Sequence, residues 1–379
     1  MQTAHDYLQQ HAALILEDIK RLVQAQSPSL NKAATDRCGN VLQAIVRERL
    51  GVEAQVCPQE TLGDHLLFCI GEGPEVTSIL GHFDTVWEID EIPMVEKDGK
   101  LYGPGVLDMK AGLIQSIWAV RALVQTGGLA QHSIRIICPS DEELGSPSSR
   151  EWIEQNAAGS SRVLVAEPAV AQTNEAKIAR KGTGRFEVRI TGKAAHAGNN
   201  PEEGISAVQE MAHQILYLHS LNAPEVGTTV NVGVAKGGSK LNVVADEALL
   251  GVDLRVTNMA EAERAVKAIR ACKPHLAGAI VEVTGDIGRP PMEQTPQNLA
   301  LFKQAQQAVK RLGFHLEGKA VGGGSDGNFT SAMGIATLDG LGATGVGIHA
   351  RHEHIIVNDI PLRTALIAEI ILGETGREG

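Results

Sequence analysis

The sequence has few cysteines, no basic run and no long apolar run. Its five cysteines are scattered over 379 residues without CxxC spacing, so we expect buried thiols rather than disulfides or zinc ligands. No stretch approaches the roughly 18 apolar residues of a membrane span, and the start of the chain has no basic segment followed by a long apolar one. We therefore expect a cytoplasmic protein without a membrane partner.

The charge balance is acidic. A formal net charge of -11 and the lack of any basic cluster argue against a nucleic-acid partner. The hydrophobic content of 43% and charged content of 21% are ordinary for a globular protein. A chain of 379 residues can bury a large core and is long enough for two domains.

Apolar periodicity in the first half of the chain predicts an α/β layer. Helical spacing is found at 3–25, 36–50, 110–126 and 148–157. Strands are expected at 52–57, 65–70, 77–80, 133–139 and 162–167. Strands that alternate with helices form a sheet covered by helices, with ligands at the carboxyl ends of the strands.

The pattern changes after about residue 181. Strands are expected at 185–191, 228–235, 241–255 and 279–285, and helices at 204–219 and 259–272. This is the element order of a ferredoxin-like split unit. Helix 296–313 and strand 335–338 resume the earlier style, so we expect residues 181–289 to be inserted into a discontinuous domain of residues 1–180 and 290–379.

Polar side chains follow the expected strands. His82 and Asp84 lie two apart in extended chain, so their side chains point the same way. A metal-binding imidazole usually needs its second nitrogen held by an acceptor, and Asp84 suits that role, although it could instead contact the substrate or the base. Glu167 follows a third strand. A later imidazole, His349, completes a set that suits a pair of divalent metals.

The doublet Glu142-Glu143 is the most informative pair in the sequence. On extended backbone, adjacent side chains project to opposite sides. One carboxylate can therefore bind metal while its neighbour faces the attacking water and passes a proton to the leaving amine.

The motifs GHFDTV, GPGVLDMKAG, DEELGS, AEP, TGKAAHAG, GGGSDG and a late Gly-x-His resemble those of the M20 metallopeptidases. The resemblance covers nearly the whole chain and is closest to the glutamate carboxypeptidase (carboxypeptidase G2-like) branch. It implies a catalytic domain with a central mixed β-sheet flanked by helices. It also implies an inserted ferredoxin-like α+β domain that serves as a lid and as the interface of a homodimer.

The resemblance further implies a dizinc site, for which cobalt or manganese are possible replacements. Glu142 would be the general base that acts on a metal-bridging hydroxide, and Asp84 the orienting carboxylate. A cis peptide after the bridging aspartate is often found in the family. The implied ligands are His82 and Glu167 for one metal, His349 and Glu143 for the other, and Asp108 as the bridge.

Substrate contacts are implied mainly in the insert. His196 would reach across a dimer and stabilise the tetrahedral oxyanion. Asn242 and Arg255 match positions that contact substrate, and Arg289 matches an arginine that grips a free α-carboxylate. Gly323, in the run Gly322 to Gly324, would let the backbone approach the ligand closely.

The late histidine motif departs from the family pattern, because His352 and His354 flank Glu353 shortly after His349. We prefer His349 as the ligand for its Gly-x-His context.

These features predict hydrolysis of an amide bond that releases a C-terminal amino acid, glutamate or a similar acidic residue, from a peptidyl or N-acyl substrate. An N-acyl amino acid deacylase of the acetylornithine deacetylase type is the alternative, since the chemistry is the same and only the acyl pocket differs.

Two other classes of protein remain as alternatives. Gly323 to Gly327 matches a G-x-S-x-G elbow, in which Ser325, Asp339 and His349 would form a serine hydrolase triad. A relative that binds metal or peptide without catalysis is the other, although such proteins commonly lose the base that is present here as Glu142.

Overall fold

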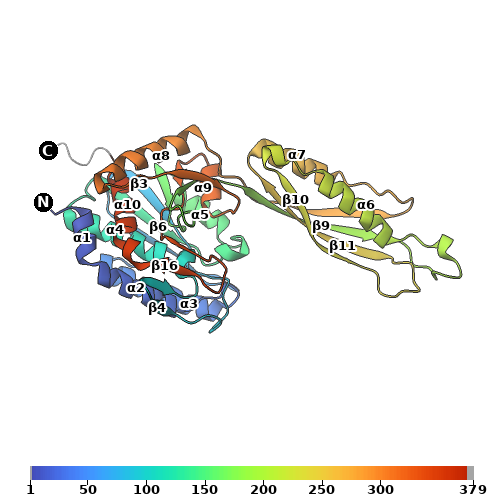
Figure 1. The fold of residues 1–379 in the computed structure, drawn as a ribbon, viewed down its shortest axis with the longest axis horizontal. Coiled ribbons are helices and arrows are strands. Elements are labelled where there is room, and N and C mark those ends of the chain that lie inside the picture. The colour runs from blue at the N-terminus through green and yellow to red at the C-terminus, as the bar shows by residue number, and fades with distance from the viewer. Residues whose placement is uncertain (1, 374–379) are drawn as a thin grey trace. The chain divides into compact units, whose positions relative to one another are not determined.

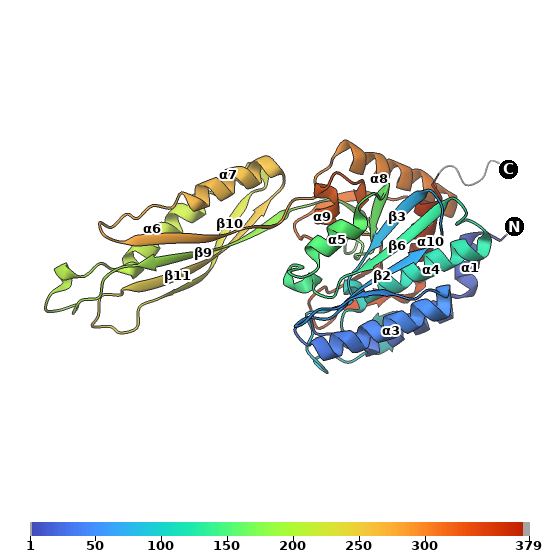
Figure 2. The same cartoon turned by 180° about the vertical axis from the view of Figure 1, so that it is seen from behind.

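The computed structural model describes residues 2–373, and the statements below concern this part of the chain. The chain divides into two compact units (Figures 1 and 2). Unit 1 combines the chain up to Ala179 with residues 294–321 and with the chain from Ser325 onward. Unit 2 comprises residues 180–293 and 322–324.

A mixed β-sheet forms the centre of unit 1, in the order β1-β2-β6-β3-β7-β14. Its strands are β1 (Gln55–Cys57), β2 (His65–Ile70), β3 (Glu75–Leu80), β6 (His132–Cys138), β7 (Arg162–Val165) and β14 (Thr337–Leu338). The strands from β6 to β14 pair in parallel, whereas β1 and β2 pair antiparallel at the other side of the sheet. In the register, Ile79 lies beside both Ile136 and Leu164. This arrangement places the carboxyl ends of β3, β6 and β7 at one edge.

Helices cover both faces of this sheet (Figure 2). They are α1 (Ala4–Gln10), α2 (Ala12–Gln24), α3 (Lys32–Leu50), α4 (Ala111–Thr126), α5 (Arg150–Ala157), α8 (Pro296–Val309), α9 (Gly327–Ala332) and α10 (Ile360–Leu372). Because side chains alternate along a strand, Leu66 and Phe68 pack into the large core with α4, while Leu67 packs into a smaller core with Ile153 of α5. Strand β2 thus contributes side chains to the cores on both faces of the sheet.

Short strands form two further sheets in unit 1. One has the order β15-β16-β5-β4, and the other pairs β13 with β8. Their bounds are β4 (Val95–Lys97), β5 (Lys100–Tyr102), β8 (Ala176–Arg180), β13 (Gly318–Val321), β15 (Gly345–Val346) and β16 (His354–Ile356). The pairing of β16 with β5 brings the chain after His349 beside the chain that leads to Asp108.

Unit 2 is an antiparallel sheet in the order β10-β11-β9-β12, with two helices on one face (Figure 1). Its elements are β9 (Gly182–Thr191), α6 (Ala207–Ser220), β10 (Thr229–Gly237), β11 (Glu247–Val256), α7 (Met259–Arg270) and β12 (Ile280–Arg289). Along β9, Phe186, Val188 and Ile190 are buried against the helices, while the residues between them are exposed. The order of elements is that of the ferredoxin-like split unit expected from the sequence.

Some expected elements differ from the structure. The helix expected at 3–25 is broken at His11, whose ring nitrogen contacts the carbonyl oxygen of Tyr7 at 2.7 Å. The strand expected at 241–255 begins only at Glu247, because residues before it form a loop in which Val244 donates to Ala195 at 2.9 Å. The sequence patterns also missed α9, α10 and the short strands, which are too brief or too uniformly buried to show a period.

Candidate metal centre

The candidate metal ligands lie where parallel strands end. His82 follows β3, Glu143 follows β6 and Glu167 follows β7. The carboxyl ends of parallel strands meet at the same edge of a sheet, so these side chains converge although they are far apart in sequence. Asp108 reaches the same place from the turn at Val106–Lys110 that precedes α4, and its peptide bond to Met109 is cis, as the resemblance implied.

Asp108 lies between two imidazoles. Its Oδ1 is 3.3 Å from Nε2 of His82, and its Oδ2 is 3.3 Å from Nε2 of His349. Glu167 lies 3.6 Å from His82, and Glu143 lies 3.1 Å from His349. Each imidazole therefore has one carboxylate of its own and shares Asp108 with the other.

This donor set fits two metal ions. Ligand atoms about 2.0–2.1 Å from a tetrahedral zinc lie about 3.3 Å from one another, which matches the spacing around Asp108. His82, Asp108 and Glu143 also offer ligand atoms that all lie within 4.8 Å of one another. A carboxylate with one oxygen toward each imidazole is the shape required of a bridge between two metals.

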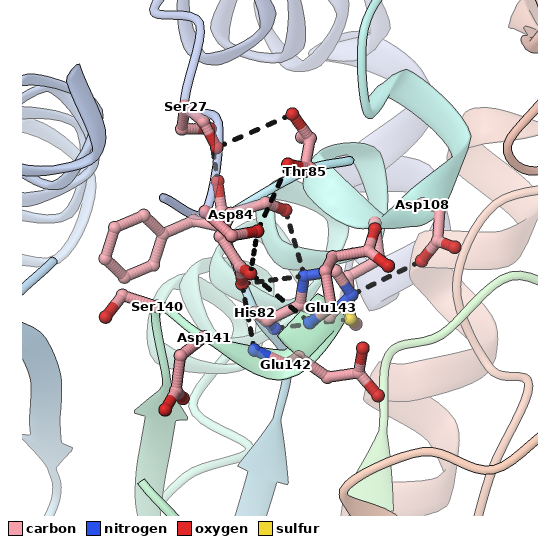
Figure 3. Close-up of polar contacts among 12 residues, drawn as sticks. Ser27, His82, Asp84, Thr85, Asp108, Ser140, Asp141, Glu142 and Glu143 are labelled. Carbon is pink, nitrogen blue, oxygen red and sulfur yellow. Dashed lines mark hydrogen bonds and ion pairs between the residues drawn. The ribbon is translucent and has the colours of Figure 1, made fainter. Parts of the chain in front are cut away.

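The orientation of His82 is set by Asp84 (Figure 3). Nδ1 of His82 lies 3.1 Å from the carbonyl oxygen of Asp84 and 3.3 Å from its Oδ1. Both residues are buried, so the imidazole cannot turn, and Nε2 is directed at Asp108. A metal-binding histidine typically has its second nitrogen held in this way.

Asp84 also holds the Glu142-Glu143 doublet in place. Its two oxygens accept hydrogen bonds from the backbone N–H groups of Glu142 at 3.2 Å and Glu143 at 3.3 Å. Its Oδ2 accepts a further hydrogen bond from the hydroxyl of Ser29 at 2.6 Å. Sequence reasoning missed Ser29, because a serine in a loop 55 residues from its partner leaves no local signal.

The expectation that Glu142 and Glu143 lie on extended backbone is wrong. They begin a 3-10 turn, Glu142–Leu144, which ends at Gly145 with a left-handed φ of 94°. Asp141, which precedes the turn, accepts hydrogen bonds from the hydroxyls of Ser148 and Ser149, which follow it. In a 3-10 turn consecutive side chains are separated by about 120°, so the two carboxylates still point in different directions.

Neighbouring charges shift the pKa values of the site. Hydrogen bonds to Asp108 and Glu143 raise the pKa of His349 to about 10. Burial lowers the pKa of His82, but hydrogen bonds to Asp108, Asp84 and Glu167 outweigh burial and raise it well above its ordinary value. Burial raises the pKa of Asp108, yet the hydrogen bonds of the two imidazoles hold it below its usual range. A metal would replace protons at these positions, because ligands bind in their deprotonated forms.

The expected substrate residues lie in unit 2. His196 is exposed, and its Nδ1 accepts hydrogen bonds from the N–H groups of Gly198 at 3.1 Å and Asn199 at 3.0 Å. Nδ1 is thereby an acceptor, so in the neutral ring the hydrogen is on Nε2. Asn242 lies on the neighbouring loop, where its carbonyl oxygen accepts from Ala197 at 3.0 Å.

The two expected arginines differ in their surroundings. The guanidinium of Arg255 forms a double hydrogen bond with Asp253, at 2.8 and 3.0 Å, so its planar fork is occupied. Arg289 ends β12 and is 7% exposed. The carbonyl oxygen of Gly323 accepts a hydrogen bond from Arg180 at 3.2 Å, which holds the glycine run to the start of unit 2.

Ser325, in the segment that matches the G-x-S-x-G elbow, is not placed to act as a nucleophile. Ser325 is fully buried, and its hydroxyl donates to Asp339 at 2.6 Å. His349 lies instead against Asp108 and Glu143. The three residues therefore do not form the relay that a serine hydrolase needs.

The sequence was compared with known protein families. Residues 79–373 match the pattern of Peptidase family M20/M25/M40. The chain therefore belongs to this family of metallopeptidases and amidohydrolases, and His82, Asp108 and Glu143 form a candidate metal-binding group in it. It hydrolyses amide bonds.

Individual relatives can be named as well. The chain is 27% identical over 368 residues to carboxypeptidase G2 from Pseudomonas sp. (strain RS-16), covering 94% of this chain and 88% of the relative. It is 30% identical over 262 residues to acetylornithine deacetylase from Proteus mirabilis (strain HI4320), covering 63% of this chain and 66% of the relative. Among solved structures it resembles aminopeptidase PepT from Bacillus cereus ATCC 10987, with a TM-score of 0.78 and 23% identity over 95% of this chain and 98% of that one.

In the part of the chain that the structure describes, no helix is both long and apolar enough to span a membrane.

Proposed function

We propose that the protein releases a C-terminal amino acid, glutamate or a similar acidic residue, from a peptidyl or N-acyl substrate. The observation that carries the proposal is the position of Asp108, with one oxygen toward His82 and the other toward His349. The similarity to carboxypeptidase G2 over 94% of this chain supports the choice of bond and product.

The ligand groups follow from the contacts around Asp108. His82 and Glu167 would hold one divalent metal, and His349 and Glu143 the other, with Asp108 shared. Zinc suits this set of nitrogen and oxygen ligands, and cobalt or manganese would be accepted by it. When bound, the metals polarise the scissile carbonyl and lower the pKa of the attacking water.

Glu142 is the proposed general base. It adjoins the ligand Glu143 in the 3-10 turn, is 8% exposed, and has its backbone fixed by the hydrogen bond to Asp84. Its carboxylate accepts a proton from the attacking water and passes that proton to the nitrogen of the leaving amine. Proton transfer by a positioned group typically contributes a factor of about 100 to 10,000 in rate.

His196 and Arg289 are the proposed substrate contacts in the insert. With Nδ1 occupied by two backbone N–H groups, His196 presents Nε2–H, the form that donates to a developing oxyanion. Arg289 has the planar fork that binds a free carboxylate through two parallel hydrogen bonds. Asn242 lies beside His196 and would contact the substrate from the same loop pair.

A homodimer through unit 2 is part of the proposal. Strands β10 and β12 are edge strands of the sheet in unit 2, and both carry mostly exposed residues. An uncovered sheet edge readily pairs with a second chain, and a symmetric pair uses the same edge twice. The exposed His196 would then act in the active site of the partner.

The deciding experiment is a panel of N-acyl amino acids and dipeptides assayed with and without added zinc. Release of acidic C-terminal residues that is lost on chelation supports the proposal. Preference for acetylornithine over all peptidyl substrates would favour the alternative, an N-acyl amino acid deacylase, to which the partial similarity with acetylornithine deacetylase points.

The general base is tested by Glu142→Ala. We expect the variant to lose at least about 100-fold in kcat while its zinc content stays unchanged, because Glu142 acts on the proton and is not a ligand. Glu151→Ala, which removes an exposed carboxylate of α5, is the control and should retain full activity. Wild-type turnover in Glu142→Ala would overturn the assignment.

A further inference from the structure

One buried carboxylate holds the loop that carries Asp108. Glu353 is 1% exposed. Its Oε1 accepts hydrogen bonds from the backbone N–H groups of Leu107 at 2.8 Å and Asp108 at 3.1 Å. Its Oε2 accepts from the N–H of Gly105 at 3.2 Å and from the indole N–H of Trp87 at 2.7 Å. All four partners are donors, so the carboxyl group is matched to them as an acceptor with two lone pairs per oxygen.

The loop depends on this carboxylate because its backbone is irregular. Gly105 has a left-handed φ of 68°, and Asp108 has φ -111° and ψ 94°, outside the helical range. Val106 donates to the carbonyl oxygen of Gly103 and Lys110 to that of Gly105, and the other buried N–H groups of the segment also need a partner. Glu353 accepts three of them, from residues 105, 107 and 108, with one side chain.

The backbone of Glu353 is fixed to the turn that carries His349. Within this turn, Ala350 donates to Gly347 at 2.8 Å, and Glu353 donates to Ala350 at 2.8 Å. Directly after Glu353, strand β16 begins and pairs with β5. The side chain therefore connects the turn of His349 to the loop of Asp108, two segments more than 200 residues apart in the sequence.

The connection made by Glu353 matters more for His349 than for His82. His82 is buried and is held by Asp84 independently of Glu353. The side chain of His349 is half-exposed, and it contacts Asp108 and Glu143. The distance from His349 to Asp108 thus depends on how the two loops are joined.

We infer that Glu353 is a positioning residue that sets the spacing of Asp108 and His349, and thereby the affinity of the metal position formed by His349, Glu143 and Asp108. The inference rests on the proposed two-metal function. Glu353 itself is not a ligand, because both of its oxygens are already engaged by the loop.

The test is zinc titration of the metal-free protein by calorimetry, with Glu353→Gln beside the wild type. An amide places an NH₂ group against two N–H donors, whichever way it is turned, so the loop must shift. We expect one zinc to bind with near wild-type affinity and the other to bind about 10- to 100-fold more weakly, the usual cost of losing a residue that supports a ligand. When the substrate concentration is varied at low zinc, kcat should fall while KM stays within about twofold.

The matched control is Glu210→Gln in unit 2. Glu210 is also fully buried and also accepts backbone N–H hydrogen bonds, from His275 and Leu276. This variant loses a comparable group and should bind both zinc ions as the wild type does. Two wild-type affinities in Glu353→Gln would overturn the inference, as would equal weakening in both variants.

Two further measurements distinguish a failure of the inference from misfolding of the variant and from failure of the proposed function. Thermal melting of metal-free Glu353→Gln should show a cooperative transition; if the variant does not fold, Trp87→Phe, which removes one donor to Oε2, is titrated instead. We expect Trp87→Phe to weaken the second zinc by a smaller factor, and unchanged affinity would overturn the inference. If the wild type binds no second zinc, the proposed function fails, whereas wild-type stoichiometry of two with unaffected variants refutes only the role of Glu353.

Discussion

At the scale of single residues, the site is built from carboxylates that each serve several donors. Asp84 accepts from the backbone of Glu142 and Glu143 and from Ser29, and it also lies against His82. The proposed base Glu142 and the proposed ligands Glu143 and His82 therefore share one buried anion. Charge-assisted hydrogen bonds of this kind are stronger than neutral ones, which explains how loops distant in sequence keep a common geometry.

Replacing Asp84 by asparagine tests this arrangement. In Asp84→Asn an NH₂ group would face backbone N–H donors, so the Glu142-Glu143 turn and His82 should both lose their orientation. We expect kcat/KM to fall about 10- to 100-fold with amide hydrolysis as the readout. Ser29→Ala, which removes a single donor to Asp84, is the comparison and should cost less than about fivefold. Equal losses in the two variants would show that Asp84 acts only through Ser29.

At the scale of elements, close contact between backbones places Glu167. A Cβ on Gly112, in the first turn of α4, would lie 1.9 Å from the carbonyl oxygen of Ala166, and a Cβ on Gly342 would lie 2.2 Å from the same atom. The end of β7 is therefore held between a helix and a loop that approach it only because both carry glycine. This contact fixes the position of Glu167, which follows β7 directly after Ala166.

Gly112→Ala should displace the end of β7. Because the conflict is with backbone rather than with a flexible side chain, we expect a loss of about 1–3 kcal/mol in the free energy of unfolding. Zinc affinity should fall at the position of His82 and Glu167. Gly127→Ala, at the end of the same helix, serves as a control, since a Cβ there meets no atom within 4 Å and only the positive φ of 77° is unfavourable. Unchanged zinc affinity in Gly112→Ala would refute the role given to this contact.

The contact between α6 and residues 275–276, made by Glu210, should respond to pH. Burial raises the pKa of Glu210 on α6, but hydrogen bonds from Gln214, Leu276 and His275 outweigh burial and lower it below its ordinary value of 4.5. A lowered pKa in the folded state means that Glu210 contributes stability above pH 4.5, and that this contribution is lost as pH falls through the folded pKa. We expect Glu210→Gln to cost about 1.5–3 kcal/mol at pH 7.

Calorimetric melting at several pH values measures this effect. The difference in melting temperature between the wild type and Glu210→Gln should be largest near pH 7 and should shrink as the pH falls below 4.5. A difference that stays constant down to pH 3 would mean that the charge of Glu210 is not what stabilises the contact between α6 and residues 275–276.

At the scale of the whole molecule, the protein has separate cores. The large core and the smaller core of unit 1 lie on the two faces of the mixed sheet, and unit 2 has its own core between its sheet and helices α6 and α7. All five proposed metal ligands belong to unit 1. Metal binding should therefore stabilise unit 1 and leave unit 2 unchanged.

Calorimetry of the metal-free and zinc-loaded protein tests this division. A ligand at 100 times its Kd stabilises the state that binds it by about 2.7 kcal/mol. We expect zinc to raise the melting temperature of unit 1 and to leave that of unit 2 unchanged. Hydrogen exchange in β9 and β11 identifies the transition that belongs to unit 2. One joint transition that shifts as a whole would contradict the proposed independence of the insert, residues 181–289.

The sequence alone determined those features that depend on local periods and on strand ends. Alternation along β9, helical spacing in α4 and α7, and polar residues after β3, β6 and β7 are written in neighbouring residues, so they could be predicted. The M20 motifs added a set of five proposed ligands, and the structure brings these residues together.

Only the tertiary structure decided how these pieces meet. The backbone of the turn at Glu142 is held by Asp84, which lies 58 residues away in the sequence. The hydroxyl of Ser29 on Asp84 and the four hydrogen bonds of Glu353 likewise join segments that are distant in sequence. No local pattern encodes them, because a buried N–H group can be satisfied by any acceptor that packing brings within reach. The spacing of the two imidazoles about Asp108 is therefore a property of the packed loops, whereas the choice of the proposed ligands is a property of the sequence.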